Sequence, residues 1–114
     1  QNWLLTNTAS GSSSWFYEDV ATNLVAGRPY TGSVFLKSDG VPMSVAVVIW
    51  AIGGPNPEEV GQTWATIGSS WQRVSTELDV NYPGHTILRF QVYVGTVGPT
   101  LNVGLADLPD VPVD

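Results

Sequence analysis

The sequence predicts an all-β fold, a β-sandwich, and three observations favour it. Apolar and polar residues alternate with a period of two in one segment after another, which is typical of strands that bury one face. Glycine (12 residues) and proline (8 residues) supply the turns that must join such strands. No stretch shows the apolar period of an amphipathic helix, so the expected strands must pack sheet against sheet.

The first four expected strands cover residues 2–8, 15–20, 30–38 and 43–51. Before the third strand, Gly27 is free to adopt a positive φ and Pro29 fixes the entry to the strand. Tyr30 is expected to lie in the core with its hydroxyl hydrogen-bonded. Asp39-Gly40 then gives a hairpin signal before the fourth strand.

The strand at residues 43–51 separates an apolar face from a mixed one. The apolar face holds Val45, Val47 and Ile49, and the mixed face holds Ser44, Ala46, Val48 and Trp50. Trp50 ends the mixed face beside the Gly53-Gly54 loop, so we expect it to contact a ligand. Ala46 and Val48 leave open that this face is buried as well.

The last four expected strands cover residues 58–67, 69–80, 86–94 and 100–108. The two prolines of residues 53–57 exclude a central strand there. Trp64 lies in the first of the four strands and is a further candidate platform for a ligand. Residues 1–108 therefore form one domain, and the Pro-rich residues 109–114 are expected to be a linker or tail.

The strand at residues 86–94 carries the most informative pattern. Leu88, Phe90, Val92 and Val94 point one way, and Arg89, Gln91 and Tyr93 point the other way. The second set combines a planar donor fork, an amide that donates and accepts, and a ring with a hydroxyl, which are groups that bind a sugar. A polar sheet face that binds nothing accounts for this strand equally well. Trp15 and Tyr17, on the strand at residues 15–20, are additional candidates for ligand contact.

The composition excludes several functions. Charged residues make up 12% of the chain, about half the usual share, and the net charge is −6. The four cations cannot form the basic patch that nucleic acid or an anionic membrane needs. No apolar run approaches the roughly 20 residues of a membrane span, and there is no cysteine. A low-charge surface of this kind suits a secreted or extracellular domain.

The acids and the one histidine do not suggest an enzyme. His85 lies in a Pro-Gly turn that does not resemble a nucleophile turn. Glu18 and Asp19 are adjacent on a strand, so they point to opposite faces and cannot act as a glycosidase pair. The other acid pairs are Glu58 with Glu59 in a Pro-rich loop, and Glu77 with Asp79 on a face shared with Arg73 and Ser75 that is expected to be solvated.

Three motifs resemble jelly-roll carbohydrate-binding modules of the galactose-binding-like superfamily, which bind xylan, glucan and related sugars. Residues 23–38 are similar to their loop of Gly, a basic residue and Tyr before a strand that ends in Lys. Trp71 and Val74 resemble their Trp-x-x-Val strand, and residues 105–108 (Leu-Ala-Asp-Leu) resemble their closing strand. The resemblance spans residues 15–108 and implies a jelly-roll sandwich in which Trp71 packs in the core.

The chain departs from that family at two points. It starts after the place of the family's Asn-Gly-x-Phe-Glu-like segment, and the closing strand carries only Asp107 where the family has a paired acid. In the family this acid often helps to hold a structural calcium. The resemblance therefore implies calcium at Asp107, which would supply one of the six to eight oxygen ligands, with the rest of the set unidentified.

Together these observations predict a non-catalytic module that binds a polysaccharide such as xylan or β-glucan. Stacking would come from Trp50 and Tyr93, and hydrogen bonds from Arg89 and Gln91. The resemblance implies a secreted bacterial protein with enzyme domains in the same chain. The alternative is a structural or protein-interaction domain of the same fold, in a phage tail or a cell-surface assembly.

Overall fold

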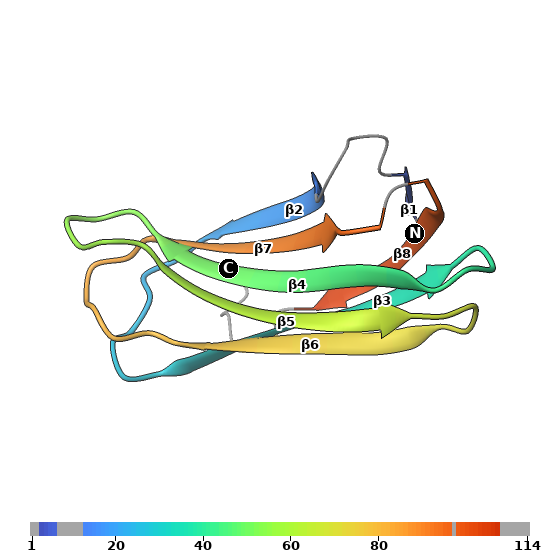
Figure 1. The fold of residues 1–114 in the computed structure, drawn as a ribbon. Helices are drawn as coiled ribbons and strands as arrows, with labels where there is room; N and C mark the ends of the chain where they lie inside the picture. The colour runs from blue at the N-terminus through green and yellow to red at the C-terminus, as the bar shows by residue number, and fades with distance from the viewer. Residues whose placement is uncertain (1–2, 7–12, 97, 108–114) are drawn as a thin grey trace.

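A computed structural model describes residues 3–6, 13–96 and 98–107, of which residues 3–6, 13–18 and 105–107 are described by their backbone alone. Every element in these ranges is a strand (Figure 1). The strands are β1 (Trp3–Thr6), β2 (Ser13–Ala21), β3 (Pro29–Ser38), β4 (Met43–Ile52), β5 (Glu59–Ile67), β6 (Gln72–Asp79), β7 (Ile87–Val94) and β8 (Thr100–Asp107). No helix in the described part of the chain is long and apolar enough to cross a membrane.

The strands form two four-stranded antiparallel sheets that pack face to face. Sheet A has the order β1-β8-β3-β6, and sheet B has the order β2-β7-β4-β5. Among consecutive strands, only β4 and β5 are paired within one sheet, while the six other connections between the described strands cross from one sheet to the other. This order is that of an eight-stranded jelly roll, so the predicted fold class is confirmed.

The core lies between the sheets and consists of the predicted inward faces. Leu88, Phe90, Val92 and Val94 of β7 are fully buried, as are Val45, Val47 and Ile49 of β4. Tyr30 is 2% exposed, and its hydroxyl accepts a hydrogen bond from the Val25 backbone amide at 2.9 Å. The alternation in the sequence therefore placed the core correctly, because side chains on a strand point to opposite faces in turn.

Two predictions need correction. Asp39-Gly40 forms a turn, with a φ of 104° at Gly40, but β3 and β4 lie in different sheets and do not make a hairpin. Trp71 is 43% exposed and lies outside the core. It precedes β6 in the same alternation as the exposed Arg73 and Ser75, because Val74 and Thr76 take the inward positions.

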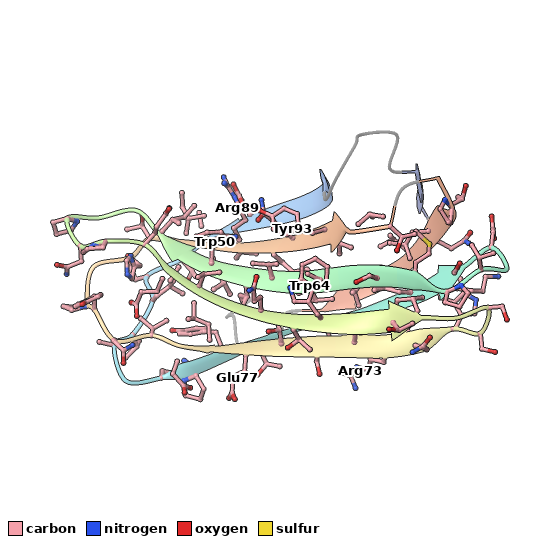
Figure 2. All side chains as sticks on the ribbon, viewed as in Figure 1. Trp50, Trp64, Arg73, Glu77, Arg89 and Tyr93 are labelled. Atoms are coloured by element: carbon pink, nitrogen blue, oxygen red, sulfur yellow. The ribbon has the colours of Figure 1, made fainter. Side chains whose placement is uncertain are left out.

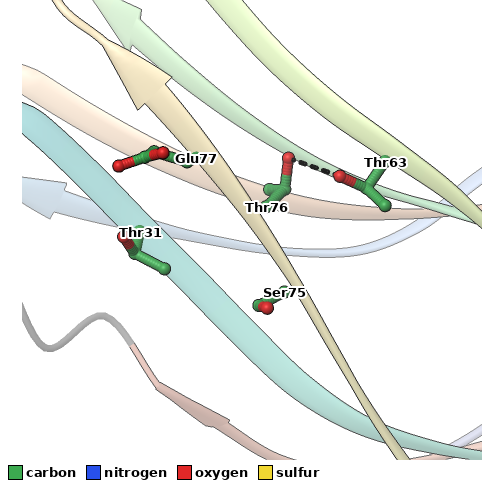
Figure 3. A pocket seen from close by; sticks show the side chains of 5 residues that line it. All are labelled: Thr31, Thr63, Ser75, Thr76 and Glu77. Carbon is green, nitrogen blue, oxygen red and sulfur yellow. Dashed lines mark hydrogen bonds between the residues drawn. The ribbon is translucent and has the colours of Figure 1, made fainter.

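The two sheets approach each other closely along the edge formed by β5 and β6. A side chain at Gly61 of β5 would overlap the backbone carbonyl of Glu77 on β6. Nearby, the Thr63 hydroxyl donates to the Thr76 hydroxyl at 3.1 Å and so joins the sheets (Figure 3). These residues border an open hollow of about 360 Å³ that is lined by Thr31, Thr63, Ser75, Thr76 and Glu77.

Candidate functional site

The outer face of sheet B gathers most of the candidate side chains. Strand pairing places Ala46 of β4 between Trp64 of β5 and Tyr93 of β7. The next rows along the face place Val48 between Gln62 and Gln91, and Trp50 between Val60 and Arg89. Arg89, Tyr93, Trp50 and Trp64 therefore meet on one face, while Arg73 and Glu77 project from the opposite side of the sandwich (Figure 2).

Small side chains on β4 form the floor of this face. Ala46 is fully buried and Val48 is 1% exposed, although both point away from the core. They are buried because the larger side chains on β5 and β7 lie over them. The possibility that this side of β4 is covered is therefore confirmed, and the cover consists of the candidate ligand residues themselves.

Trp64 extends along the sheet instead of standing away from it. Gly95 follows β7, and a Cβ added at this position would lie 3.1 Å from Cζ3 of the Trp64 indole. Because β4 separates β5 from β7, the indole must cross β4 to reach Gly95. One face of the ring thus packs on the sheet, and the side chain remains 49% exposed. A flat, half-exposed indole of this kind is a platform on which a sugar ring can stack.

Trp50 and Gln91, which lie two rows and one row from Trp64 along the face, form a fixed pair. The Trp50 indole Nε1 donates to Gln91 Oε1 at 2.7 Å, and both side chains are partly buried. This bond orients the indole of Trp50 across the floor of the face. It also engages the acceptor oxygen of Gln91, so the donors of its amide nitrogen are what Gln91 can offer to a ligand.

Arg89 is held by an acid that the sequence prediction did not assign to it. Its Nε and Nη2 donate to the two carboxylate oxygens of Asp19 at 2.7 and 2.9 Å. The hydrogen bonds from Arg89 lower the pKa of Asp19 below its usual range and outweigh the partial burial, which raises it. The bidentate geometry holds the guanidinium plane in place beside Trp50.

A hollow of about 230 Å³ opens at this end of the face. It is lined by Trp50, Ile52, Glu58, Arg89, Gln91 and Tyr93. Four of the six residues predicted to bind ligand are therefore brought together by the fold. Figure 1 shows that β4 and β5 bow along their length, so the face is not flat.

The other two predicted residues, Trp15 and Tyr17, have side chains outside the described residues. The backbone of β2 pairs Tyr17 with Gln91, which places Tyr17 in the same row of sheet B. The Asp107 side chain also lies outside the described residues. Among the residues whose side chains are described, no three acids or histidines come together as metal ligands. Calcium at Asp107 therefore stays a prediction.

His85 and Glu59 have a structural arrangement. His85 is 1% exposed, with Nδ1 3.0 Å from the Gly53 carbonyl oxygen and Nε2 3.0 Å from Glu59 Oε2. Glu59 also accepts hydrogen bonds from the backbone amides of Asn81 and Tyr82, at 2.9 and 3.1 Å. Burial raises the pKa of Glu59, but these hydrogen bonds lower it by more, so the pKa lies below its usual range. The cluster ties the loop between β6 and β7 to the loop between β4 and β5 and to the start of β5, at one end of the sandwich.

Sequence reasoning underestimated Trp64 and missed Asp19 and Glu58 as members of this face. Trp64 lies between the polar Gln62 and Thr66 on the outer side of β5, and an indole in such a position was the available signal. Asp19 and Glu58 join the face through strand pairing and a loop. Neither spacing in the sequence nor composition indicates those contacts.

The sequence matches no known protein family and no curated protein. The structure, however, resembles solved structures of carbohydrate-binding modules. One, described as "CBM4 structure and function", has a TM-score of 0.70 at 17% identity, over 94% of this chain and 69% of that chain. Another, TmCBM61 in complex with beta-1,4-galactotriose, has a TM-score of 0.49 at 16% identity, over 94% of this chain and 67% of that chain.

The first of these similarities establishes the fold. The chain has a jelly-roll β-sandwich like that of this solved module, which is the fold predicted from the sequence. At this level of identity the comparison does not carry over a ligand. The ligand has to be inferred from the residues of the face itself.

Proposed function

We propose that the protein is a non-catalytic module that binds a polysaccharide on the outer face of sheet B. The observation that carries this proposal is the Trp64 indole, which lies along the sheet over buried Ala46 and is 49% exposed. Tyr93 flanks the same residue from β7, and Trp50 lies farther along the face. Aromatic platforms spaced along one bowed face suit a chain of sugar rings better than a compact ligand.

The proposed mechanism combines stacking with hydrogen bonds to the sugar rim. A pyranose that covers about 100 Å² of an indole contributes about 2 kcal/mol before ordering costs are subtracted. Gln91, Arg89 and Glu58 border the hollow and provide polar groups for hydroxyls. Because association itself is costly, two platforms and a few hydrogen bonds leave a Kd of about micromolar to millimolar. Such an affinity suits a module that concentrates an enzyme on a polymer.

The contacts of the acidic residues also favour a binding role. A glycosidase needs two carboxyl groups that flank the scissile bond. On this face, Asp19 is bound bidentately by Arg89; at the end of the sandwich, Glu59 is turned toward His85 and two backbone amides. Each has a lowered pKa, which is the opposite of what a general acid requires. We propose xylan or β-glucan as the ligand, a secreted location, and enzyme domains in the same chain.

The test is retention of the purified domain on a panel of soluble and insoluble polysaccharides, with and without calcium. Wild type should be retarded by at least one plant cell-wall glycan, and Trp64→Ala should weaken binding by about 30-fold, which corresponds to the stacking energy above. Tyr82→Ala is the matched control, because Tyr82 is 46% exposed but lies in the loop after β6 and does not line the hollow of the face. A change of binding with calcium would support a bound ion.

Two results would refute the proposal. If Trp64→Ala and Trp50→Ala both retained wild-type binding while remaining folded, the ligand would bind elsewhere. If no glycan retarded the wild type and its size in solution increased with concentration, the protein would be a structural or protein-interaction domain of the same fold.

A further inference from the structure

A second aromatic surface lies on the opposite side of the sandwich, on the outer face of sheet A. Trp71 and Phe35 are 43% and 41% exposed there. A Cβ added at Gly104 of β8 would lie 3.2 Å from Cζ3 of Trp71 and 3.3 Å from Cβ of Phe35. Since β3 separates β6 from β8, the Trp71 indole crosses β3 and packs one ring face on the sheet. It is a platform of the same design as Trp64, also seated on a glycine two strands away.

This surface also concentrates positive charge. The Lys37 ammonium lies 5.1 Å from the centroid of the Trp71 ring. Arg73 is paired across the strands with Phe35, and its Nη2 donates to the hydroxyl of buried Ser33 at 3.2 Å. Two of the chain's four cations therefore border two exposed aromatic rings, in a protein whose net charge is −6.

No acid whose side chain is described neutralises the two cations of this surface, so they can bind an anion. Arg89 is engaged by Asp19 on the other face, and the Arg28 guanidinium lies 5.3 Å from the Tyr30 ring centroid. Within the described residues, neither Lys37 nor Arg73 forms an ion pair with an acid. The acids nearest in register are Asp107 of β8, which pairs with Ser33 and whose side chain is not among those described, Asp39, which accepts a hydrogen bond from Asn102 at 2.9 Å, and Glu77, two strand positions beyond Ser75.

We propose that this surface binds an acidic sugar, a uronate residue of a polysaccharide. The C–H face of the pyranose would stack on Trp71 beside Phe35, and its carboxylate would meet Lys37 and Arg73. A neutral sugar would offer the two cations no anionic partner, and an apolar protein segment would have to desolvate them, which is costly. The surface is separate from the face around Trp64, so this inference does not depend on the proposed function.

A galacturonic acid trimer and its methyl ester form a matched pair of ligands, because the ester keeps the ring and removes the charge. Binding of each should be followed by NMR chemical-shift perturbation and by calorimetry at low and moderate salt. The acid trimer should bind the wild type more tightly than the ester, and salt should weaken its binding. Trp71→Ala and Lys37→Gln should each reduce binding of the acid trimer by about tenfold or more. Trp64→Ala should leave it unchanged.

Several outcomes would overturn the inference. They are no binding of the acid trimer, equal binding of the acid and the ester, or loss of binding in Trp64→Ala but not in Trp71→Ala. A dimer that Trp71→Ala abolishes, without any binding of the trimer, would assign the surface to a second copy of the chain. Lys37→Gln keeps the test decisive if Trp71→Ala fails to fold, because Lys37 lies on the surface and contributes little to packing.

Discussion

Replacement of Gly61 by alanine tests how tightly the two sheets close at the β5–β6 edge. A Cβ at this position would overlap the Glu77 carbonyl oxygen and would lie 3.1 Å from the Glu77 carbonyl carbon and 3.3 Å from Leu78 Cα. Carbon atoms in contact normally lie about 3.5–4.0 Å apart. The obstructing atoms are backbone atoms, which have no rotamer to change. The strand β5 must therefore move by on the order of 1 Å away from β6.

The magnitude follows from two opposing terms. Overpacking of a closely packed contact costs about 1–3 kcal/mol, and a backbone obstruction belongs at the upper end of that range. Alanine also lowers the conformational entropy of the unfolded chain, which stabilises the folded state by about 0.4–1 kcal/mol. The free energy of unfolding should thus fall by about 2 kcal/mol. For 114 residues, an unfolding entropy of about 0.24 kcal/mol/K converts this loss into a Tm decrease of about 8 °C.

Gly68→Ala is the matched control, because the nearest atom to its added Cβ would be Gln72 Oε1 at 3.9 Å, an ordinary contact. Neither glycine has a positive φ. Both variants should be unfolded by urea and by heat, with tryptophan fluorescence as the signal. Gly68→Ala should lie within about 0.5 kcal/mol of the wild type. If Gly61→Ala were as stable as Gly68→Ala, the close approach of the two sheets would be wrong.

Two further predictions concern the loop cluster and the sugar-binding face. Glu59→Gln should lower the free energy of unfolding by about 1–2 kcal/mol at pH 7, since it weakens the hydrogen bonds from Asn81, Tyr82 and His85. Because the folded-state pKa of Glu59 is lowered, its contribution is present above its usual pKa and is lost as the pH falls through the folded value. The difference between wild type and variant in urea unfolding should therefore be largest at neutral pH and shrink as the pH falls below the usual glutamate pKa; a difference that stays constant over the whole acid range in which the protein is folded would contradict this. Gln91→Leu removes the acceptor of the Trp50 indole and should weaken glycan binding several-fold in a titration while Tm falls by only a few degrees; unchanged affinity would show that this orientation is unimportant.

The sequence by itself determined the strands and the core. Alternation from Leu88 to Val94 placed every second residue in the core, and Gly27 and Gly40 adopt positive φ in the turns. These features depend on local geometry: side chains alternate along a strand, and glycine tolerates φ values that other residues avoid. The three motifs also identified the jelly-roll type, because their order along the chain reflects the order of strands.

The tertiary structure decided which residues share a face and which of them are exposed. Trp71 was expected in the core and lies outside it, whereas Trp64 emerges as the open platform of sheet B. Each indole lies along its sheet because a glycine two strands away, Gly104 or Gly95, leaves room for the ring. The pairing of Arg89 with Asp19 joins residues that are 70 positions apart. Such contacts depend on which strands become neighbours, and long-range strand pairing is set by packing of the whole sandwich rather than by any local pattern.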